Sequence, residues 1–231
     1  MNNLDKNKIK NSVEEAVVPI QDGAVIMVGG FMACGAPELL IDGLVKKGVR
    51  NLTIISDDAG FPDRGVGKLI AAGQVKTLLA GHVGLNPEVA RRMNTGVEAE
   101  KLECILVPIG TIAERIRAGG VGLGGILTPT GVGTVVAEGK QVISVDGRDY
   151  LLEKPLRAEF ALIRASKIDR FGNAVFYGTT RNFNPLMAMA ADYVIAGACE
   201  IVETGQIDPN DVHLSGIFVD AIVGGETLWQ M

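Results

Sequence analysis

The chain has 231 residues, of which 47% are hydrophobic and 21% are charged, and its formal net charge at pH 7 is −5. This length and apolar content are sufficient for a sizeable core, and we expect a single domain over residues 1–231. The negative charge argues against a nucleic-acid partner. No apolar run reaches the roughly 20 residues that a membrane-spanning helix needs, so we expect no membrane association.

Cysteine and histidine usage fits a cytoplasmic protein. The first 16 residues carry lysines but no apolar stretch, which predicts a frayed start leading into a helix and not a secretory signal. Cys34, Cys104 and Cys199 are far apart in apolar surroundings, as expected of reduced thiols. The two histidines, His82 and His213, have no metal-ligand spacing, so we expect no metal site.

Short apolar runs alternate with helical patterns through the first half of the chain. Pro37 and Gly48 delimit the first of these helices, and Thr111 with Glu114 predicts a capping box for the last. This alternation predicts an α/β fold with an open, mostly parallel sheet and helices on both faces. The expected strands are residues 24–28, 52–55, 75–80 and 104–107, and the expected helices are residues 37–47, 66–72, 87–93 and 111–118.

The second half of the chain does not continue the regular alternation of short apolar runs and helical patterns. Residues 119–133 form a long glycine-rich segment, and residues 141–152 predict a β-hairpin with an Asp146-Gly147 turn. Gly120 to Gly125 satisfies the dinucleotide pattern G-x-G-x-x-G, but no strand precedes it and no helix follows it. We find no internal repeat and no domain linker. The remaining expected elements are strands at 160–165, 193–196 and 216–223 and a helix at 185–191.

The stretch from Asp22 to Pro37, DGAVIMVGGFMACGAP, predicts a strand, a glycine loop and a helix. A loop at the carboxyl end of a strand can offer its backbone N–H groups to an anion or a carbonyl oxygen. The simpler alternative is a tight connection without function. Cys34 within this loop is either a nucleophilic thiol or a small packing residue.

Polar residues follow the next strands, and ligands of such sheets collect at the carboxyl ends of the strands. Asp57 and Asp58 are candidates for an acid/base pair, although adjacent strand residues point to opposite faces and one carboxylate could serve a cap or turn. His82 is either a general base or an ordinary loop residue.

The Asp22–Pro37 stretch resembles the first signature of the alpha subunit of family I CoA-transferases. Further stretches are similar to that family, in particular to its acetate/butyrate–acetoacetate members. They are VPIGTIAERIRAGG (107–120), TPTGVGTVVAEGK (128–140), TRNFNP (180–185) and EIVETGQIDP (200–209).

The resemblance implies a half-enzyme that exchanges coenzyme A (CoA) between a short-chain acyl-CoA and a carboxylate such as acetoacetate. The nucleophilic glutamate is then on a beta subunit, with no catalytic residue in this chain, ping-pong kinetics and an α2β2 assembly. The implied CoA-binding loop consists of Gly29, Gly30, Phe31, Met32, Ala33, Cys34 and Gly35, and the implied substrate pocket contains Asp57, Asp58, Ile109 and Gly110.

Two departures from the family pattern affect this pocket. Relatives commonly have Ser-Asn-Asn where this chain has Ser56-Asp57-Asp58, and Gln where this chain has Ile109. Losing that amide removes a hydrogen-bond donor from an oxyanion-type site. Two alternatives therefore stay open: a stand-alone sugar-phosphate isomerase-like enzyme that uses Asp57 or Asp58 as base, and a non-catalytic regulatory subunit.

Overall fold

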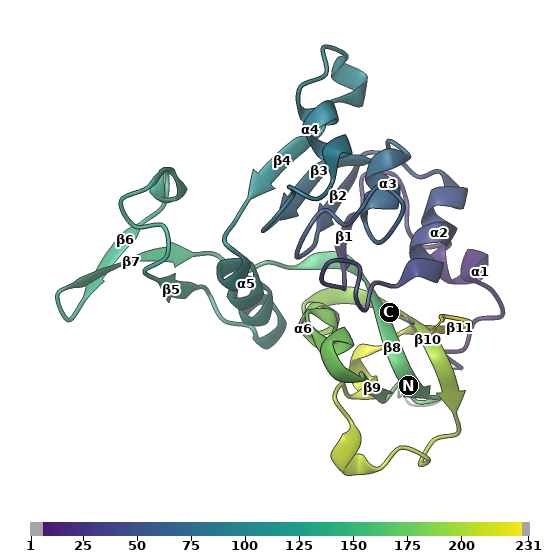
Figure 1. Ribbon diagram of the computed structural model, residues 1–231. Helices are drawn as coiled ribbons and strands as arrows, with labels where there is room; N and C mark the ends of the chain where they lie inside the picture. Colours follow the sequence, from purple (N-terminus) through teal and green to yellow (C-terminus); the bar gives the residue numbers. More distant parts are fainter. Residues whose placement is uncertain (1–6, 228–231) are drawn as a thin grey trace.

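The computed structural model describes residues 7–227, so residues 1–6 of the expected frayed start lie outside the described residues. Before the expected helix, the described part is paired and not frayed, since Lys10 donates its N–H to Ile222 at 2.8 Å. One eight-stranded sheet forms its centre (Figure 1). Seven strands are parallel, in the order β11-β10-β8-β1-β2-β3-β4, and β9 pairs antiparallel with β8. The strands are β1 (Val25–Val28), β2 (Leu52–Ile55), β3 (Val75–Ala80), β4 (Glu103–Leu106), β8 (Ala158–Asp169), β9 (Ala174–Val175), β10 (Ala191–Val202) and β11 (Ala221–Gly224).

Helices cover both faces of this sheet, which confirms the predicted α/β class. Successive residues of a strand point to opposite faces of the sheet, and each face carries one apolar layer of the core. Ile26 lies in the layer between the sheet and the first four helices, and Met27 lies in the layer that contains the last two helices. No helix of the described residues is long and apolar enough to cross a membrane. The helices are α1 (Val13–Val17), α2 (Glu38–Lys47), α3 (Gly67–Ala71), α4 (Pro87–Met93), α5 (Ile109–Val121) and α6 (Asn184–Met189).

Several predicted boundaries need correction. The capping box at Thr111 is wrong, because α5 begins at Ile109 after the N-cap Pro108, and Thr111 is buried inside its first turn. The last predicted strand, residues 216–223, is shorter than expected. Residues 216–218 form a 3₁₀ helix, and β11 begins only at Ala221. Strands β8 and β10 are each 12 residues long, well beyond their apolar centres, because they pair with each other along their length.

The predicted hairpin excursion is confirmed and extended. The strands β6 (Val142–Val145) and β7 (Arg148–Glu153) meet at Asp146 and Gly147, both at positive φ as a two-residue hairpin turn requires. A third strand, β5 (Ile126–Thr128), pairs with β7 from within the glycine-rich segment and was not predicted. This small antiparallel sheet projects from the body of the molecule (Figure 1).

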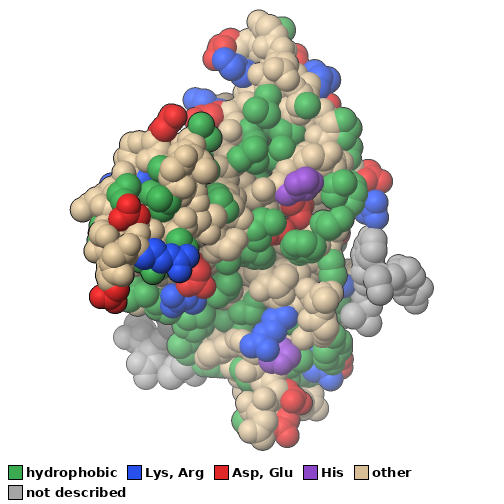
Figure 2. Space-filling view, turned by 60° about the vertical axis from the view of Figure 1, so that its left-hand side comes forward, with side chains coloured by type: hydrophobic (Ala, Val, Ile, Leu, Met, Phe, Trp, Pro, Cys, Tyr) green, Lys and Arg blue, Asp and Glu red, His purple; other side chains and the backbone are tan. Residues whose placement is uncertain are grey.

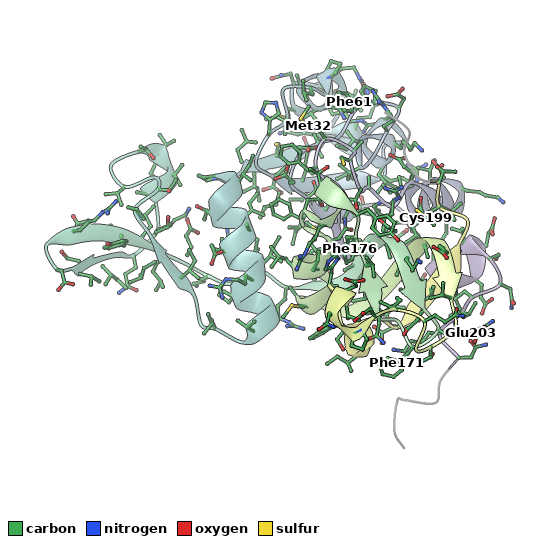
Figure 3. All side chains as sticks on the ribbon, turned by 60° about the horizontal axis from the view of Figure 1, so that its bottom comes forward. Met32, Phe61, Phe171, Phe176, Cys199 and Glu203 are labelled. Carbon is green, nitrogen blue, oxygen red and sulfur yellow. The ribbon has the colours of Figure 1, made fainter. Side chains whose placement is uncertain are left out.

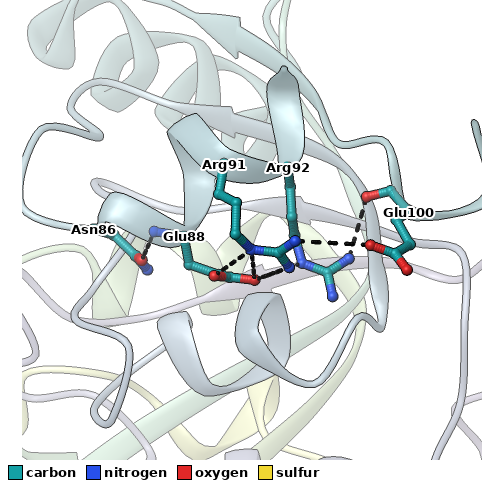
Figure 4. A network of polar contacts seen from close by, with 5 residues as sticks. All are labelled: Asn86, Glu88, Arg91, Arg92 and Glu100. Carbon is teal, nitrogen blue, oxygen red and sulfur yellow. Dashed lines mark hydrogen bonds and ion pairs between the residues drawn. The ribbon is translucent and has the colours of Figure 1, made fainter. Parts of the chain in front are cut away.

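A polar network fixes α4 at the edge of the fold (Figure 4). Asn86 caps the helix by accepting the N–H of Glu88, and Glu88 accepts hydrogen bonds from both Arg91 and Arg92. Asn86 is 1% exposed and also donates to the carbonyl oxygen of Ala59 at 2.9 Å. The loop before α4 is thereby held against the loop that follows β2.

Glu226, near the C-terminal end of the described residues, packs against the start of α2. Pro37 at the N-cap makes no side-chain hydrogen bond, and the Glu226 carboxylate instead accepts the Leu39 N–H at 3.0 Å. Glu226 is 6% exposed. Burial, opposed by the Leu39 bond and the charge of Arg164, raises the pKa of Glu226 to about 7.

This carboxyl makes the stability of the fold depend on pH. Because folding raises the pKa of Glu226 from 4.5 to about 7, the protonated carboxyl contributes to the free energy of unfolding. This contribution is at most about 3 kcal/mol; it is fully present below about pH 4.5 and is lost as the pH rises through 7. We expect Glu226→Gln, which can still accept the Leu39 N–H, to lose less unfolding free energy between pH 4.5 and 7.5. Urea titrations at both pH values test this, with the exposed Glu203→Gln as control. Equal pH dependence of the wild type and Glu226→Gln would contradict the assignment.

Candidate functional site at the carboxyl edge of the sheet

The loops that were predicted to share one edge of the sheet do so. Backbone hydrogen bonds join these loops to a neighbouring strand or to each other: Gly29 donates to Leu162 of β8 at 2.9 Å, and Gly81 donates to the Asp57 carbonyl oxygen, in the loop after β2, at 2.8 Å. The loop after β1 therefore lies between β2 and the distant β8, as the sheet order requires. Parallel strands place such loops where ligands collect in open α/β sheets.

The glycine loop is a tight hairpin in a strained conformation. Phe31 and Cys34 exchange both backbone hydrogen bonds, at 3.0 and 2.8 Å. The two residues between them, Met32 and Ala33, have φ of 47° and 65°, a region that non-glycine residues occupy at a cost of order 1–3 kcal/mol each. Gly30 has φ of 120°, and a Cβ there would lie 3.1 Å from the backbone of Ala36. We call Gly30–Gly35 the first hairpin.

A second hairpin repeats this design 30 residues later, contrary to the expectation of no internal repeat. The sequence G-F-x-x-x-G recurs as Gly60–Gly65, and Phe61 and Arg64 again exchange both backbone hydrogen bonds. A Cβ at Gly65 would contact Ala33 at 3.5 Å, so the two hairpins pack together. Figure 3 shows Met32 and Phe61, one from each hairpin, at the same end of the molecule. The repeated hexapeptide was the available sequence signal.

Two asparagines of the TRNFNP stretch hold the first hairpin from behind. Asn182 donates to the Cys34 carbonyl oxygen at 2.9 Å, and Asn184 donates to that of Gly35 at 3.1 Å. Asn184 is fully buried and also accepts the Arg164 N–H at 3.0 Å, which ties the hairpin to β8. The TRNFNP stretch resembles the family pattern, but nothing in its local sequence links these asparagines to the loop.

Asp58 has the turn role expected of one of the two aspartates. Its carboxylate accepts the Met32 N–H at 2.5 Å and the Gly60 N–H at 2.7 Å. The expectation that Asp57 and Asp58 face apart is wrong, because the two side chains interact with each other. Strand alternation does not apply to them, since β2 ends at Ile55. Asp57 is 1% exposed; burial, then the charge of Asp58, raises its pKa to about 7.

The remaining predicted residues lie farther along the same edge. Ile109 is 39% exposed at the start of α5, and its side chain packs on Gly81. Gly110 follows in the first turn, with open space where a Cβ would be. His82 forms a backbone bridge with Asp58, and its ring lies against Gly84.

The surface beside the first hairpin is open and apolar. A cavity of about 480 Å³ is lined by Phe31, Cys34, Thr179 and Asn182. Phe31 and Met32 are 43% and 44% exposed. Hydrophobic side chains gather on one face of the molecule in Figure 2. The described residues contain no cluster of three or more His, Cys, Asp or Glu side chains that could hold a metal ion. The arrangement offers a backbone loop and an apolar rim to an organic ligand.

The profile of the family described as coenzyme A transferase matches residues 10–225. The acetate CoA-transferase subunit alpha of Escherichia coli is 49% identical over 212 residues, which cover 92% of this chain and 94% of the relative. The acetoacetyl-CoA:acetate/butyrate CoA transferase alpha subunit of Clostridium acetobutylicum is 48% identical, with 88% and 91% covered. The chain therefore belongs to the coenzyme A transferase family. Within this family it corresponds to the alpha subunit, which confirms the resemblance seen in the sequence.

A solved structure supports the same conclusion. The acyl-CoA transferase YdiF of E. coli O157:H7, as its thioester complex with CoA, is similar to this chain with a TM-score of 0.80 and 26% identity. The match covers 95% of this chain but 47% of the YdiF chain, so this chain spans about half the length of that enzyme.

Proposed function

We propose that this chain is the alpha subunit of an enzyme that transfers CoA between a short-chain acyl-CoA and a carboxylate such as acetoacetate. The observation that carries the proposal is the first hairpin, whose sequence resembles the family signature and whose strained backbone is held by the side chains of Asp58, Asn182 and Asn184. The acyl groups are suggested by the names of the acetate and acetoacetyl-CoA:acetate/butyrate relatives.

The residues at the edge of the sheet fit a CoA substrate. Gly30 has a positive φ and packs tightly on Ala36, so the loop needs a glycine there to hold its shape, and the adjoining cavity can accept an apolar chain. We assign Gly29, Gly30, Phe31, Met32, Ala33, Cys34 and Gly35 to CoA binding. We assign Asp57, Asp58, Ile109 and Gly110 to the acyl pocket.

We further propose that the nucleophile is a glutamate of a beta subunit. Glu38 and Glu226, which adjoin the helix after the first hairpin, are both engaged: Glu38 accepts the Gly65 N–H at 2.6 Å, and Glu226 accepts the Leu39 N–H. A partner glutamate would attack the acyl-CoA carbonyl and expel the CoA thiolate, which gives a mixed anhydride. The thiolate would then attack the glutamyl carbonyl and release the donor carboxylate, which leaves an enzyme–CoA thioester. The acceptor carboxylate then reverses these steps, in an α2β2 assembly of the cytoplasm.

The test is CoA exchange between an acyl-CoA and acetoacetate, by this chain alone and with its co-expressed beta subunit. We expect exchange only from the pair, and hydroxylamine should trap an acyl group on the partner. Full activity of the chain alone would place the nucleophile here and overturn the half-enzyme proposal. A folded pair without exchange would favour the regulatory alternative, and sugar-phosphate isomerisation by the chain alone would favour the isomerase alternative.

A further inference from the structure

The Asp58 carboxylate joins the two hairpins. One oxygen accepts the N–H of Met32, at the tip of the first hairpin, and the other accepts the N–H of Gly60, where the second hairpin begins. The side chain is 8% exposed, so these bonds are shielded from water. Two backbone donors stabilise the ionised form of a carboxyl group. The shape of the first hairpin thus depends on the carboxyl group of Asp58.

The carboxyl group of Asp57, beside it, is placed differently. Both of its oxygens are buried, and neither has a hydrogen-bond donor among the described N–H and O–H groups. An ionised carboxylate in such a place is strongly unfavourable. The neighbouring charge has the same sign, which disfavours ionisation of Asp57 further. The protonated form is the one that this environment suits.

Among the described residues, no positively charged side chain is one of the groups that shift the pKa of Asp57. The first turn of α5, which contains Ile109, has no titratable side chain. Burial raises the pKa of Asp57 most, and the charge and close approach of the Asp58 side chain raise it further. The other titratable side chains on the surrounding described loops and helix starts include Cys34, Glu38, Asp63, Arg64, Lys68 and His82, and Lys68 is paired with Glu38 at 2.8 Å.

We propose that Asp57 and Asp58 share one proton: the protonated Asp57 carboxyl donates to the Asp58 carboxylate and steadies it against Met32 and Gly60. Asp57 is then a positioning residue for the first hairpin. When its proton leaves to solvent, two negative charges stand side by side, and repulsion draws Asp58 away from the two N–H groups. This inference rests on the proposed function to the extent that the first hairpin binds CoA.

The first experiment measures kcat/KM for acyl-CoA at pH 6 and pH 8 in the α/β complex. A single group with a pKa of about 7 predicts an approximately tenfold loss for the wild type over this range, mainly through KM. Asp57→Asn cannot ionise and is expected to have a nearly flat profile. Asp63→Asn, on the tip of the second hairpin with a 79% exposed side chain, is the matched control and should follow the wild type.

The second experiment needs no enzyme activity. Because the pKa of Asp57 is raised on folding, the wild type should lose stability as the pH rises through 7, and Asp57→Asn should not. We expect the unfolding temperature of Asp57→Asn minus that of the wild type to increase from pH 6 to pH 8. The contribution of Glu226 cancels in this difference. An equal difference at both pH values would overturn the shared proton, even in a complex without exchange activity. A pH-dependent difference with identical kinetic profiles would overturn the positioning role.

Discussion

Gly30→Val in the α/β complex is expected to reduce CoA exchange by at least about a hundredfold, a loss comparable to removal of an oxyanion donor. Gly30 has φ of 120°, where a β-branched residue is strained, and a Cβ would press on the backbone of Ala36 at 3.1 Å. The first hairpin would have to move, and its backbone N–H groups would shift from the positions proposed for ligand binding. Steady-state exchange kinetics measure the effect.

Gly48→Val is the matched control for this variant. Gly48 also has a positive φ, of 76°, but it ends α2 with nothing within 4 Å of a Cβ. It should lose about 1–2 kcal/mol of unfolding free energy from backbone strain and keep its exchange activity. Gly30→Ala gives a smaller side chain if Gly30→Val fails to fold. Wild-type turnover in a folded Gly30→Val complex would rule out the assignment of the first hairpin to CoA binding.

The second large effect concerns stability. A Cβ at Gly29 would lie 2.0 Å from the Asn184 side-chain oxygen, so Gly29→Ala is expected to cost about 3 kcal/mol or more of unfolding free energy. Asn184→Ala removes the partner of the Arg164 N–H and of the Gly35 carbonyl, a loss of about 2–4 kcal/mol. Because Asn184→Ala also clears the space, the double variant should cost at least about 1 kcal/mol less than the sum.

Urea unfolding of the four proteins in this cycle gives the coupling energy directly. Gly96→Ala is the control, since Gly96 has open space where a Cβ would be and should change stability little. Additive losses for Gly29→Ala and Asn184→Ala would mean that the amide does not occupy the space above Gly29. The glycine loop would then not pack against Asn184 at the start of α6.

The fold was largely predictable, because each buried strand in the first half is a short apolar run between turn residues. Gly48 and the Asp146-Gly147 turn were found correctly, since their backbone conformations restrict the residue types that fit. Strand β5 could not be found, because three residues in a glycine-rich segment carry no period and gain their pairing only from β7. Thr111 failed as a cap because Pro108 supplied an earlier start of the helix.

The site was predictable as a set of strand ends but not as a set of contacts. The glycine motif and the aspartates lie where the parallel topology places them. The connection of Asp58 to Met32 spans 26 residues, and that of Asn184 to Gly35 spans 149 residues. No local pattern encodes such contacts, since they depend on which strands become neighbours. The coupling of Asp57 to Asp58 was missed because alternation was applied beyond the end of the strand.

The position of β1 in the sheet also has a consequence for the order of folding. One neighbour of β1 is β2, which follows it closely, but the other is β8, more than a hundred residues later. A ribosome therefore releases the whole glycine motif long before Arg164, Asn182 and Asn184 exist to hold it. Contacts of such long sequence separation form slowly. The first hairpin, among the earliest segments to be synthesised, is among the last to acquire its working shape.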